Sequence, residues 1–295
     1  MLTRVDRVQA VVADRGATAA AYTRLLDAQV VREDRVGVLG ARRSVVRLGA
    51  SEVELLEPDG AGLAADFLAH TKGGLFAAGF ATPDIARLGA HLQARGVSVI
   101  EEGGQLFVSA QALRVPGLRV VISTDTTQAS SGLVRHLYEA TLLIDNAPDA
   151  VAKTAATFGL DTSHFVAIRS AEYGYEGTLT LFHPDHLDRI EMITPHDSAK
   201  TMGRFFAKRG ACLYMCYAEA DHLAPIRERL LAHAPQQWTG PRDDATPGNL
   251  YIHPAALGGM MLGISRTTVA WTWSGHPERV RVAGLPGATS STAKV

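Results

Sequence analysis

The sequence has few cysteines. Its 295 residues include two, Cys212 and Cys216, which lie four positions apart in one apolar segment. If that segment is a strand, both side chains point to the same face. They then lie too far apart along it for an easy disulfide, and two cysteines are too few for a zinc site. We expect both to be buried thiols.

The sequence also lacks a signal peptide and any run of about 20 apolar residues, so we expect a cytoplasmic protein without a membrane partner. Its net charge is -1 and its charged residues are of mixed sign, which suits a soluble surface. It has no strongly basic patch of the kind that binds nucleic acid. We expect a small-molecule ligand, and the chain could be a monomer or a homodimer.

The first half of the chain contains the order strand, helix and three strands twice. A short helical segment at 64–70 separates the two cycles, and Gly96 provides a stop for the second helix. The first cycle has strands at 5–12, 28–32, 41–48 and 52–56 with a helix at 16–26. The second has strands at 75–80, 97–100, 105–109 and 119–123 with a helix at 85–95.

The second half repeats this order. The third cycle has strands at 137–144, 165–170, 177–182 and 189–193 with a helix at 147–158. A helical segment at 199–208 precedes the fourth cycle, with strands at 213–218, 249–253 and 260–265 and a helix at 223–233. We therefore predict a domain at 1–124, a polar linker at 125–134, a second domain at 135–274 and a flexible tail at 275–295.

The two halves can be aligned residue by residue. Val53–Pro58 (VELLEP) matches Ile190–Pro195 (IEMITP) at an offset of 137 residues, and the segment around Leu75 matches that around Leu213 at an offset of 138. Such a nearly constant offset indicates internal duplication.

Strand-helix-strand-strand-strand modules of this kind resemble the vicinal oxygen chelate superfamily of glyoxalase I, methylmalonyl-CoA epimerase, bleomycin-resistance proteins and extradiol dioxygenases. Val53–Pro58 with the following Gly-Gly turn, and Tyr251–Pro254 followed by Gly258-Gly259, are most similar to the epimerase, whereas four modules in one chain resemble the dioxygenases. The resemblance implies an α+β fold, internally duplicated, in which four βαβββ modules pair into two cup-shaped mixed sheets. We call the sheet of the first half cup one and that of the second half cup two.

The resemblance also implies positions for metal ligands inside each cup. In cup one they fall on Arg7, Glu54, Leu75 and Val121, and in cup two on Glu139, Glu191, Leu213 and Gly263. Apolar side chains and arginine cannot bind a metal. We therefore expect either no cofactor or a divalent metal in a non-standard site, which would be formed by Glu139, Glu191 and His253.

Two pairs of charged residues are the candidate sites. Arg7 and Glu54 could form a structural ion pair that replaces a lost metal, or could anchor an anionic substrate. Glu139 and Glu191 could form an acid/base pair, because one of two nearby carboxylates holds its proton. Alternatively, Arg189 could neutralise one of them.

Other polar and aromatic residues receive smaller roles. We expect Arg189, Tyr214 and His253 to contact the substrate together with Arg7 and Glu54. We expect Tyr173 and Tyr175 to lie in a loop over cup two, and Trp271 and Trp273 to close a core from a late strand.

These observations favour a small-molecule enzyme that transfers a proton beside a carbonyl, as an isomerase or lyase, with Glu139 and Glu191 as catalytic residues. Its substrate would be an organic acid, a thioester or an aromatic catabolite. An alternative is a metal-free protein that binds or sequesters a ligand. A third reading is a ring-cleaving dioxygenase with displaced metal ligands.

Overall fold

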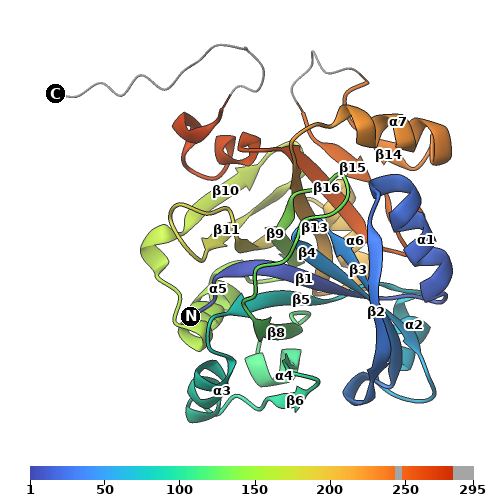
Figure 1. Cartoon of the computed structure of the whole chain (residues 1–295). Helices are drawn as coiled ribbons and strands as arrows, with labels where there is room; N and C mark the ends of the chain where they lie inside the picture. Colours follow the sequence, from blue (N-terminus) through green and yellow to red (C-terminus); the bar gives the residue numbers. More distant parts are fainter. Residues whose placement is uncertain (243–247, 282–295) are drawn as a thin grey trace, which may run out of the picture.

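Each half of the chain folds into one eight-stranded mixed sheet (Figure 1). The computed structural model describes residues 1–242 and 248–281. The strand order is β2-β3-β4-β1-β5-β8-β7-β6 in the first sheet and β10-β11-β12-β9-β13-β16-β15-β14 in the second. The same order in both sheets confirms the predicted α+β fold of four modules paired into two cups.

In the first half, two modules join where β1 and β5 pair in antiparallel orientation. The strands are β1 (Arg4–Val11), β2 (Gln29–Val36), β3 (Ala41–Leu48), β4 (Ser51–Pro58), β5 (Gly74–Thr82), β6 (Ile100–Glu102), β7 (Gln105–Val108) and β8 (Val120–Thr124). The helices are α1 (Arg15–Leu26), α2 (Leu63–Thr71), α3 (Ile85–Ala94) and α4 (Ala110–Leu113).

In the second half, β9 and β13 form the corresponding antiparallel pair. The strands are β9 (His136–Leu143), β10 (Val166–Ser170), β11 (Tyr175–Leu181), β12 (Arg189–Pro195), β13 (Cys212–Ala220), β14 (Trp238–Thr239), β15 (Leu250–Ile252) and β16 (Met261–Arg266). The helices are α5 (Ala147–Phe158), α6 (Thr201–Arg209) and α7 (Ala224–His233).

Some predicted boundaries were wrong. Strand β2 continues to Val36, beyond the predicted end at Arg32, because its exposed polar residues hide the alternation on which such predictions depend. The predicted strand at 97–100 begins only at Ile100, and the short β14 was not predicted. Trp271 lies in a 3-10 helix instead of a strand, where it is buried.

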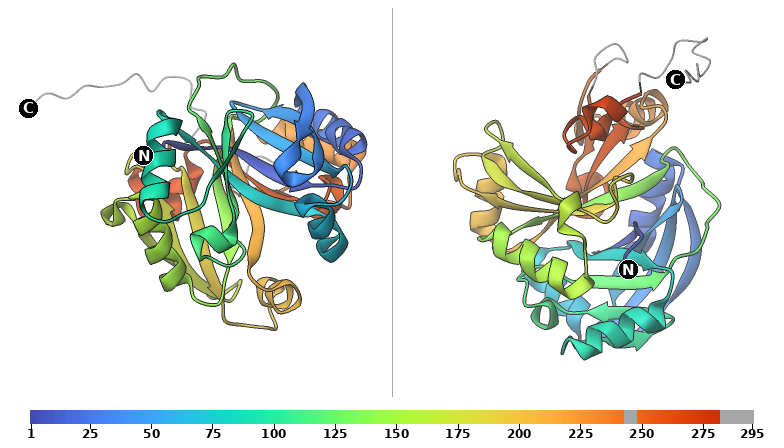
Figure 2. Two further views of the ribbon diagram at one scale, coloured as in Figure 1. Left: turned by 90° about the horizontal axis from the view of Figure 1, so that it is seen from below. Right: turned by 90° about the vertical axis from the view of Figure 1, so that its left-hand side faces the viewer.

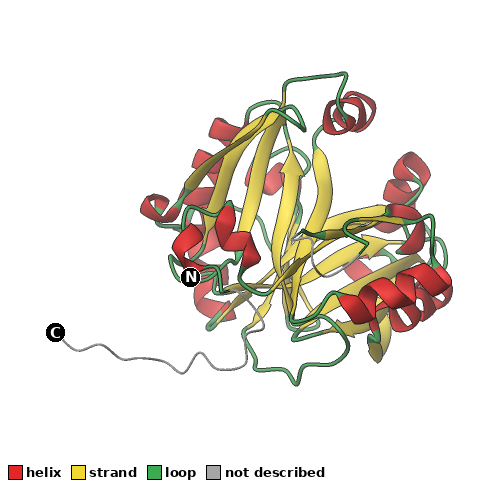
Figure 3. Cartoon of the chain, turned by 90° about the horizontal axis from the view of Figure 1, so that it is seen from above, coloured by secondary structure: helices red, strands yellow, loops and turns green. Residues whose placement is uncertain are grey.

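The helices lie at the periphery, outside the two sheets (Figures 2 and 3). Side-chain caps start several of them: Asp14 accepts a hydrogen bond from the backbone N–H of Ala17 at α1, and Asn146 from that of Asp149 at α5. The helices of the two halves also meet, since Arg229 of α7 forms an ion pair of 2.9 Å with Asp27 at the end of α1.

The two halves share one apolar core. Its largest cluster contains Val8 of β1 and Leu142 of β9, and the ring of Phe80 lies 6.4 Å from that of Phe158 and 5.3 Å from that of Phe182. Both cysteines are free thiols, with Cys216 buried and Cys212 half-buried. None of the helices in the described part of the chain is long and apolar enough to cross a membrane.

The predicted linker lies against the first sheet. Asp125 forms an ion pair of 2.8 Å with Arg4, and Ser131 forms a bridge with Gly49. Residues 277–279, within the predicted tail, form a 3-10 helix, and the rest of that tail from 282 onward lies outside the described residues.

Candidate functional site

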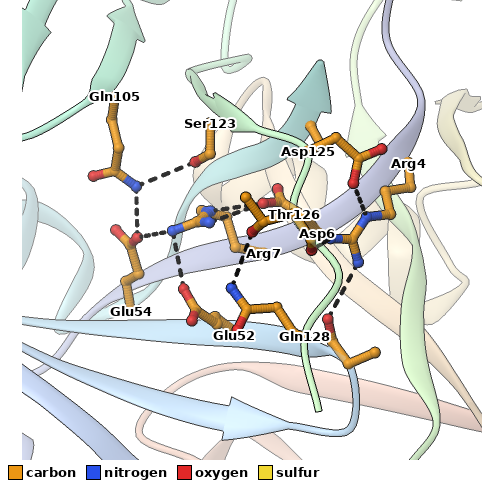
Figure 4. Close-up of polar contacts among 12 residues, drawn as sticks. Arg4, Asp6, Arg7, Glu52, Glu54, Gln105, Ser123, Asp125, Thr126 and Gln128 are labelled. Atoms are coloured by element: carbon orange, nitrogen blue, oxygen red, sulfur yellow. Dashed lines mark hydrogen bonds and ion pairs between the residues drawn. The ribbon is translucent and has the colours of Figure 1, made fainter. Parts of the chain in front are cut away.

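Cup one contains a buried network of hydrogen bonds and ion pairs around Glu54 of β4 (Figure 4). The Glu54 carboxylate is fully buried, and one of its oxygens accepts hydrogen bonds from Arg7 at 2.7 Å and Gln105 at 2.7 Å. The other accepts from Gln9 at 2.8 Å and Arg43 at 3.0 Å. Glu54 therefore has four donors, two of them cationic.

This network keeps Glu54 ionised. Burial alone would raise its pKa, but the charges of Arg7 and Arg43 and the hydrogen bonds outweigh burial and lower the pKa to about 2. Arg7 also contacts Asp6 at 2.8 Å and Glu52 at 3.0 Å. The predicted contact between Arg7 and Glu54 is present, and its surroundings favour the structural ion pair over an anchor for substrate.

Cup two brings together the other predicted pair, Glu139 of β9 and Glu191 of β12. In the ladder between these strands, Glu139 lies beside Arg189 and Glu191 lies beside Thr141. Arg189 donates from Nε to Glu139 Oε2 at 2.6 Å, and both side chains are almost completely buried. Arg189 thus neutralises Glu139, which is the alternative that the sequence left open.

Within the described residues, Glu191 has no such cationic partner. The Thr141 hydroxyl lies 2.7 Å from Glu191 Oε2 and 3.1 Å from Glu139 Oε1, so it bridges the two carboxyl groups. Burial and the nearby charge of Glu139 raise the pKa of Glu191 well above its ordinary value, and Thr141 and Arg189 offset this only in part. Because 8% of Glu191 is exposed and 1% of Glu139, Glu191 is the more accessible of the two.

Tyrosines lie on several strands of cup two, and one of them, Tyr217, lies opposite Glu139 in the ladder. Burial, and then the charges of Glu191 and Glu139, raise the pKa of Tyr175 at the start of β11. Tyr217 donates to the Tyr251 hydroxyl at 3.2 Å, and Asn249 donates to it at 3.4 Å. Among the described residues, the Tyr251 hydroxyl accepts two hydrogen bonds and donates none.

Several of these residues were not predicted from the sequence. Thr141, Tyr217 and Tyr251 received no role, because Tyr217 and Tyr251 lie 34 residues apart and Thr141 lies 50 residues from Glu191. The strand register brings them together: Tyr217 lies opposite Glu139, and Tyr251 lies opposite Gly263. The two-residue alternation from Glu139 to Thr141 is the one signal that could have identified Thr141.

The remaining predicted positions lie elsewhere. Leu213 lies beside Leu142 at the start of β13, four residues before Tyr217. Tyr214 packs edge-on against Phe205 at 5.0 Å and lies near Tyr173 and Tyr251. The His253 ring lies 3.4 Å from the Thr239 hydroxyl and does not join the two glutamates.

The donor set of cup two does not fit a metal ion. Within residues 1–242 and 248–281, no three His, Cys, Asp or Glu side chains are grouped as a metal site would require. Glu139 is already neutralised by Arg189, and no imidazole of these residues joins Glu191. A catalytic zinc or iron site needs about three donors, usually with histidine among them.

Residues 6–108 match the family model described as glyoxalase/bleomycin resistance protein/dioxygenase superfamily. A comparison with curated proteins found no match. Among solved structures, a variant of 4-hydroxymandelate synthase from Streptomyces coelicolor is similar over 90% of this chain and 93% of that chain, at 11% identity and a TM-score of 0.67.

Methylmalonyl-CoA epimerases are similar over shorter segments. The enzyme from Streptomyces coelicolor is 21% identical over 42% of this chain and 100% of that chain, with a TM-score of 0.38. The enzyme from Mycobacterium tuberculosis is 19% identical over 45% of this chain and 89% of that chain, also with a TM-score of 0.38.

The family model covers most of the first half, and the second half repeats its strand order. At 11% identity, the similarity to the 4-hydroxymandelate synthase variant is evidence for the fold alone. The first half of the chain therefore matches the glyoxalase/bleomycin resistance protein/dioxygenase superfamily model, and the second half repeats the same strand order.

Proposed function

We propose that cup two moves a proton to and from the carbon beside a carbonyl group of a small organic substrate, with Glu191 as the proton carrier. The observation that supports this most directly is the unequal environment of the two glutamates. Glu139 forms an ion pair of 2.6 Å with Arg189, while burial and the nearby Glu139 raise the pKa of Glu191. A carboxyl group with a raised pKa beside a second carboxyl group that is held in an ion pair suits acid/base chemistry.

In this proposal, each group has a distinct task. Ionised Glu191 takes the proton from carbon, and its raised pKa makes it a stronger base than an ordinary carboxylate. The Tyr251 hydroxyl donates a hydrogen bond to the oxygen on which negative charge develops. Returning the proton to the same carbon completes an isomerisation, and loss of a neighbouring group completes an elimination.

Solvent deuterium exchange tests this reaction whatever its final product is. The protein is incubated in D₂O with a panel of 2-oxo acids and acyl thioesters, and loss of the hydrogen beside the carbonyl is followed by NMR. We expect the wild-type protein to exchange at least one of these compounds and Glu191→Gln to lose about 10²- to 10⁴-fold in rate. The matched control is Glu176→Gln, since Glu176 is exposed on β11.

A second measurement is independent of substrate choice. Infrared difference spectra between wild type and Glu191→Gln, recorded over a pH series, should show a C=O band of a protonated carboxyl group that persists to higher pH than that of an ordinary glutamate. Absence of that band, or equal exchange rates in the two proteins, would count against the proton-carrier role.

Ligand binding without chemistry is the second candidate function. The hydrogen-bonded hydroxyls of Tyr217 and Tyr251 favour it, because such groups suit recognition of a small ligand. A compound that binds cup two tightly and shows no exchange in the wild-type protein would select this alternative.

A further inference from the structure

A cavity of about 760 Å³ lies between the two linker helices α2 and α6, and we call it the interhelix groove. It is bounded by the starts of β5 and β13 and by the hairpin that precedes β16, and neither Glu54 nor Glu191 lines it. Its volume falls within the range of about 300–1,000 Å³ that is usual for small-ligand sites.

Two arginines line the groove, and each packs on phenylalanine rings. The guanidinium carbon of Arg119 lies 4.8 Å from the ring centre of Phe76 and 5.8 Å from that of Phe67. The guanidinium carbon of Arg209 lies 5.5 Å from the ring centre of Phe205. Stacking holds the planar groups in place and leaves their N–H donors available at the edges.

Neither arginine has another partner in the described part of the chain. Arg119 and Arg209 make no side-chain hydrogen bond and no ion pair there, whereas the buried Arg7, Arg43 and Arg189 are all paired with carboxylates. Burial lowers the pKa of Arg119, because its charge is partly removed from water. A desolvated cation without a counter-charge is unfavourable unless an anion completes the site.

The other residues that line the groove are also mainly basic or aromatic. Lys72 adds a positive charge, and Asp66, the one acidic residue among the described residues that line the groove, is exposed on α2. Phe67, Phe76, Phe205 and Tyr214 provide flat apolar walls. The groove is therefore complementary to a molecule that combines negative charge with a flat apolar body.

We propose that the interhelix groove is a second ligand site, which binds an organic anion with an aromatic body and a carboxylate or phosphate group. Arg119 and Arg209 take the anionic group, and the phenylalanine rings take the aromatic body. The groove shares Tyr214 with the surroundings of cup two, since Tyr214 lines the groove and lies near Tyr173 and Tyr251. The proposal does not depend on catalysis by Glu191.

Isothermal titration with phenyl phosphate, benzoate and the neutral benzyl alcohol tests this site in the full-length protein. We expect at least one of the two anions to bind at least tenfold more tightly than benzyl alcohol, and the preferred anion identifies the chemical class. Arg119→Met and Arg209→Met should each weaken that anion at least tenfold. Arg87→Met, at an exposed position of α3, is the matched control.

Stability and oligomeric state complete the test. Because Arg119 lacks a counter-charge among the described residues, Arg119→Met should unfold at the same or a higher temperature than wild type, so weaker binding would not reflect unfolding. Glu191→Gln should bind the anion like wild type, which separates this site from cup two. Equal binding of all three compounds, no effect of either arginine variant, or a dimer that Arg119→Met dissociates would overturn the proposal.

Discussion

The two cups use the same ladder positions with opposite charges. In cup one, Arg7 of β1 lies beside Glu52 of β4, and in cup two, Glu139 of β9 lies beside Arg189 of β12. Each pair is in contact, at 3.0 Å between Arg7 and Glu52 and at 2.6 Å between Arg189 and Glu139. Exchanging the two charges between the strands retains an ion pair in each cup. It also changes the neighbour of the next glutamate, since Glu54 lies near the cation of Arg7 and Glu191 lies near the carboxyl group of Glu139.

The number of donors then decides the protonation of that glutamate. Glu54 accepts from Arg7, Gln9, Arg43 and Gln105. In cup two, the ladder positions of the first three of these hold Glu139, Thr141 and Gly177. Glu191 therefore keeps one hydroxyl donor and gains a negative neighbour. A duplicated scaffold thus holds one ionised glutamate and one whose pKa is strongly raised.

Removal of Arg189 is expected to have the largest effect on this comparison. Arg189→Met leaves two buried glutamates without a cation and should lower the free energy of unfolding by about 3–5 kcal/mol. Urea unfolding measures the loss, and the double variant with Glu139→Gln should recover part of it. Arg169→Met, at an exposed ion pair, is the control. Equal losses of stability in Arg189→Met and Arg169→Met would contradict the role of Arg189.

Asp188 tests a second difference between the halves. Its Oδ1 accepts a hydrogen bond of 2.7 Å from the Val5 N–H, and at the matching position Ser51 accepts one of 2.9 Å from Leu137. Burial raises the pKa of Asp188 to about 7, against the hydrogen bond from Val5 and the charge of Arg4. The folded protein therefore binds a proton that the unfolded chain releases near its ordinary pKa of 3.8.

The sign follows from proton linkage. The contribution of Asp188 to stability falls as pH rises from about 4 to about 7 and is then constant, because over this range its carboxyl group binds more protons in the folded state than in the unfolded state. Asp188→Asn keeps an acceptor oxygen and removes the titration, so its stability relative to wild type should increase over the same range by up to about 4 kcal/mol. Urea unfolding from pH 4 to 8 measures this difference, and a pH-independent difference would show that Asp188 does not titrate there.

The matched glutamate variants come next in expected size. Glu54→Gln leaves Arg7 and Arg43 without their shared counter-charge and should cost about 3 kcal/mol. Glu191→Gln removes a carboxyl group whose charged form is disfavoured by burial and by Glu139, and should change stability by less than about 1 kcal/mol. Both are measured by urea unfolding at pH 7, and a larger loss for Glu191→Gln would reverse the assignment.

The smallest effect is expected at Thr141. Thr141→Val removes the hydroxyl that bridges the two carboxyl groups and should cost about 1 kcal/mol. Because that hydroxyl lowers the pKa of Glu191, the variant should raise this pKa further, as an infrared titration of the carboxyl band would show. Thr180→Val, which breaks a buried hydrogen bond to the Ile190 carbonyl, is a control for lost packing.

The sequence by itself determined the architecture. The offset of 137 residues between Val53–Pro58 and Ile190–Pro195 revealed the duplication, and hydrophobic alternation located most strands of both sheets. The family resemblance identified the difference at the first-strand position, which holds Arg7 in one half and Glu139 in the other. The edge strand β2 and the short β14 were poorly predicted, since exposed or very short strands carry little pattern.

The side-chain contacts inside each cup could be identified only from the tertiary structure. The sequence left open whether Arg189 neutralises Glu139 or Glu191, and only the ladder register and rotamers assign it to Glu139. Tyr217 occupies its place because Gly263 lies beside it, where a Cβ atom would be 2.3 Å from the tyrosine ring. Such contacts join residues that are far apart in the chain, so local sequence patterns cannot encode them. The repeated order of strands and helices, in contrast, is visible in local sequence patterns along both halves.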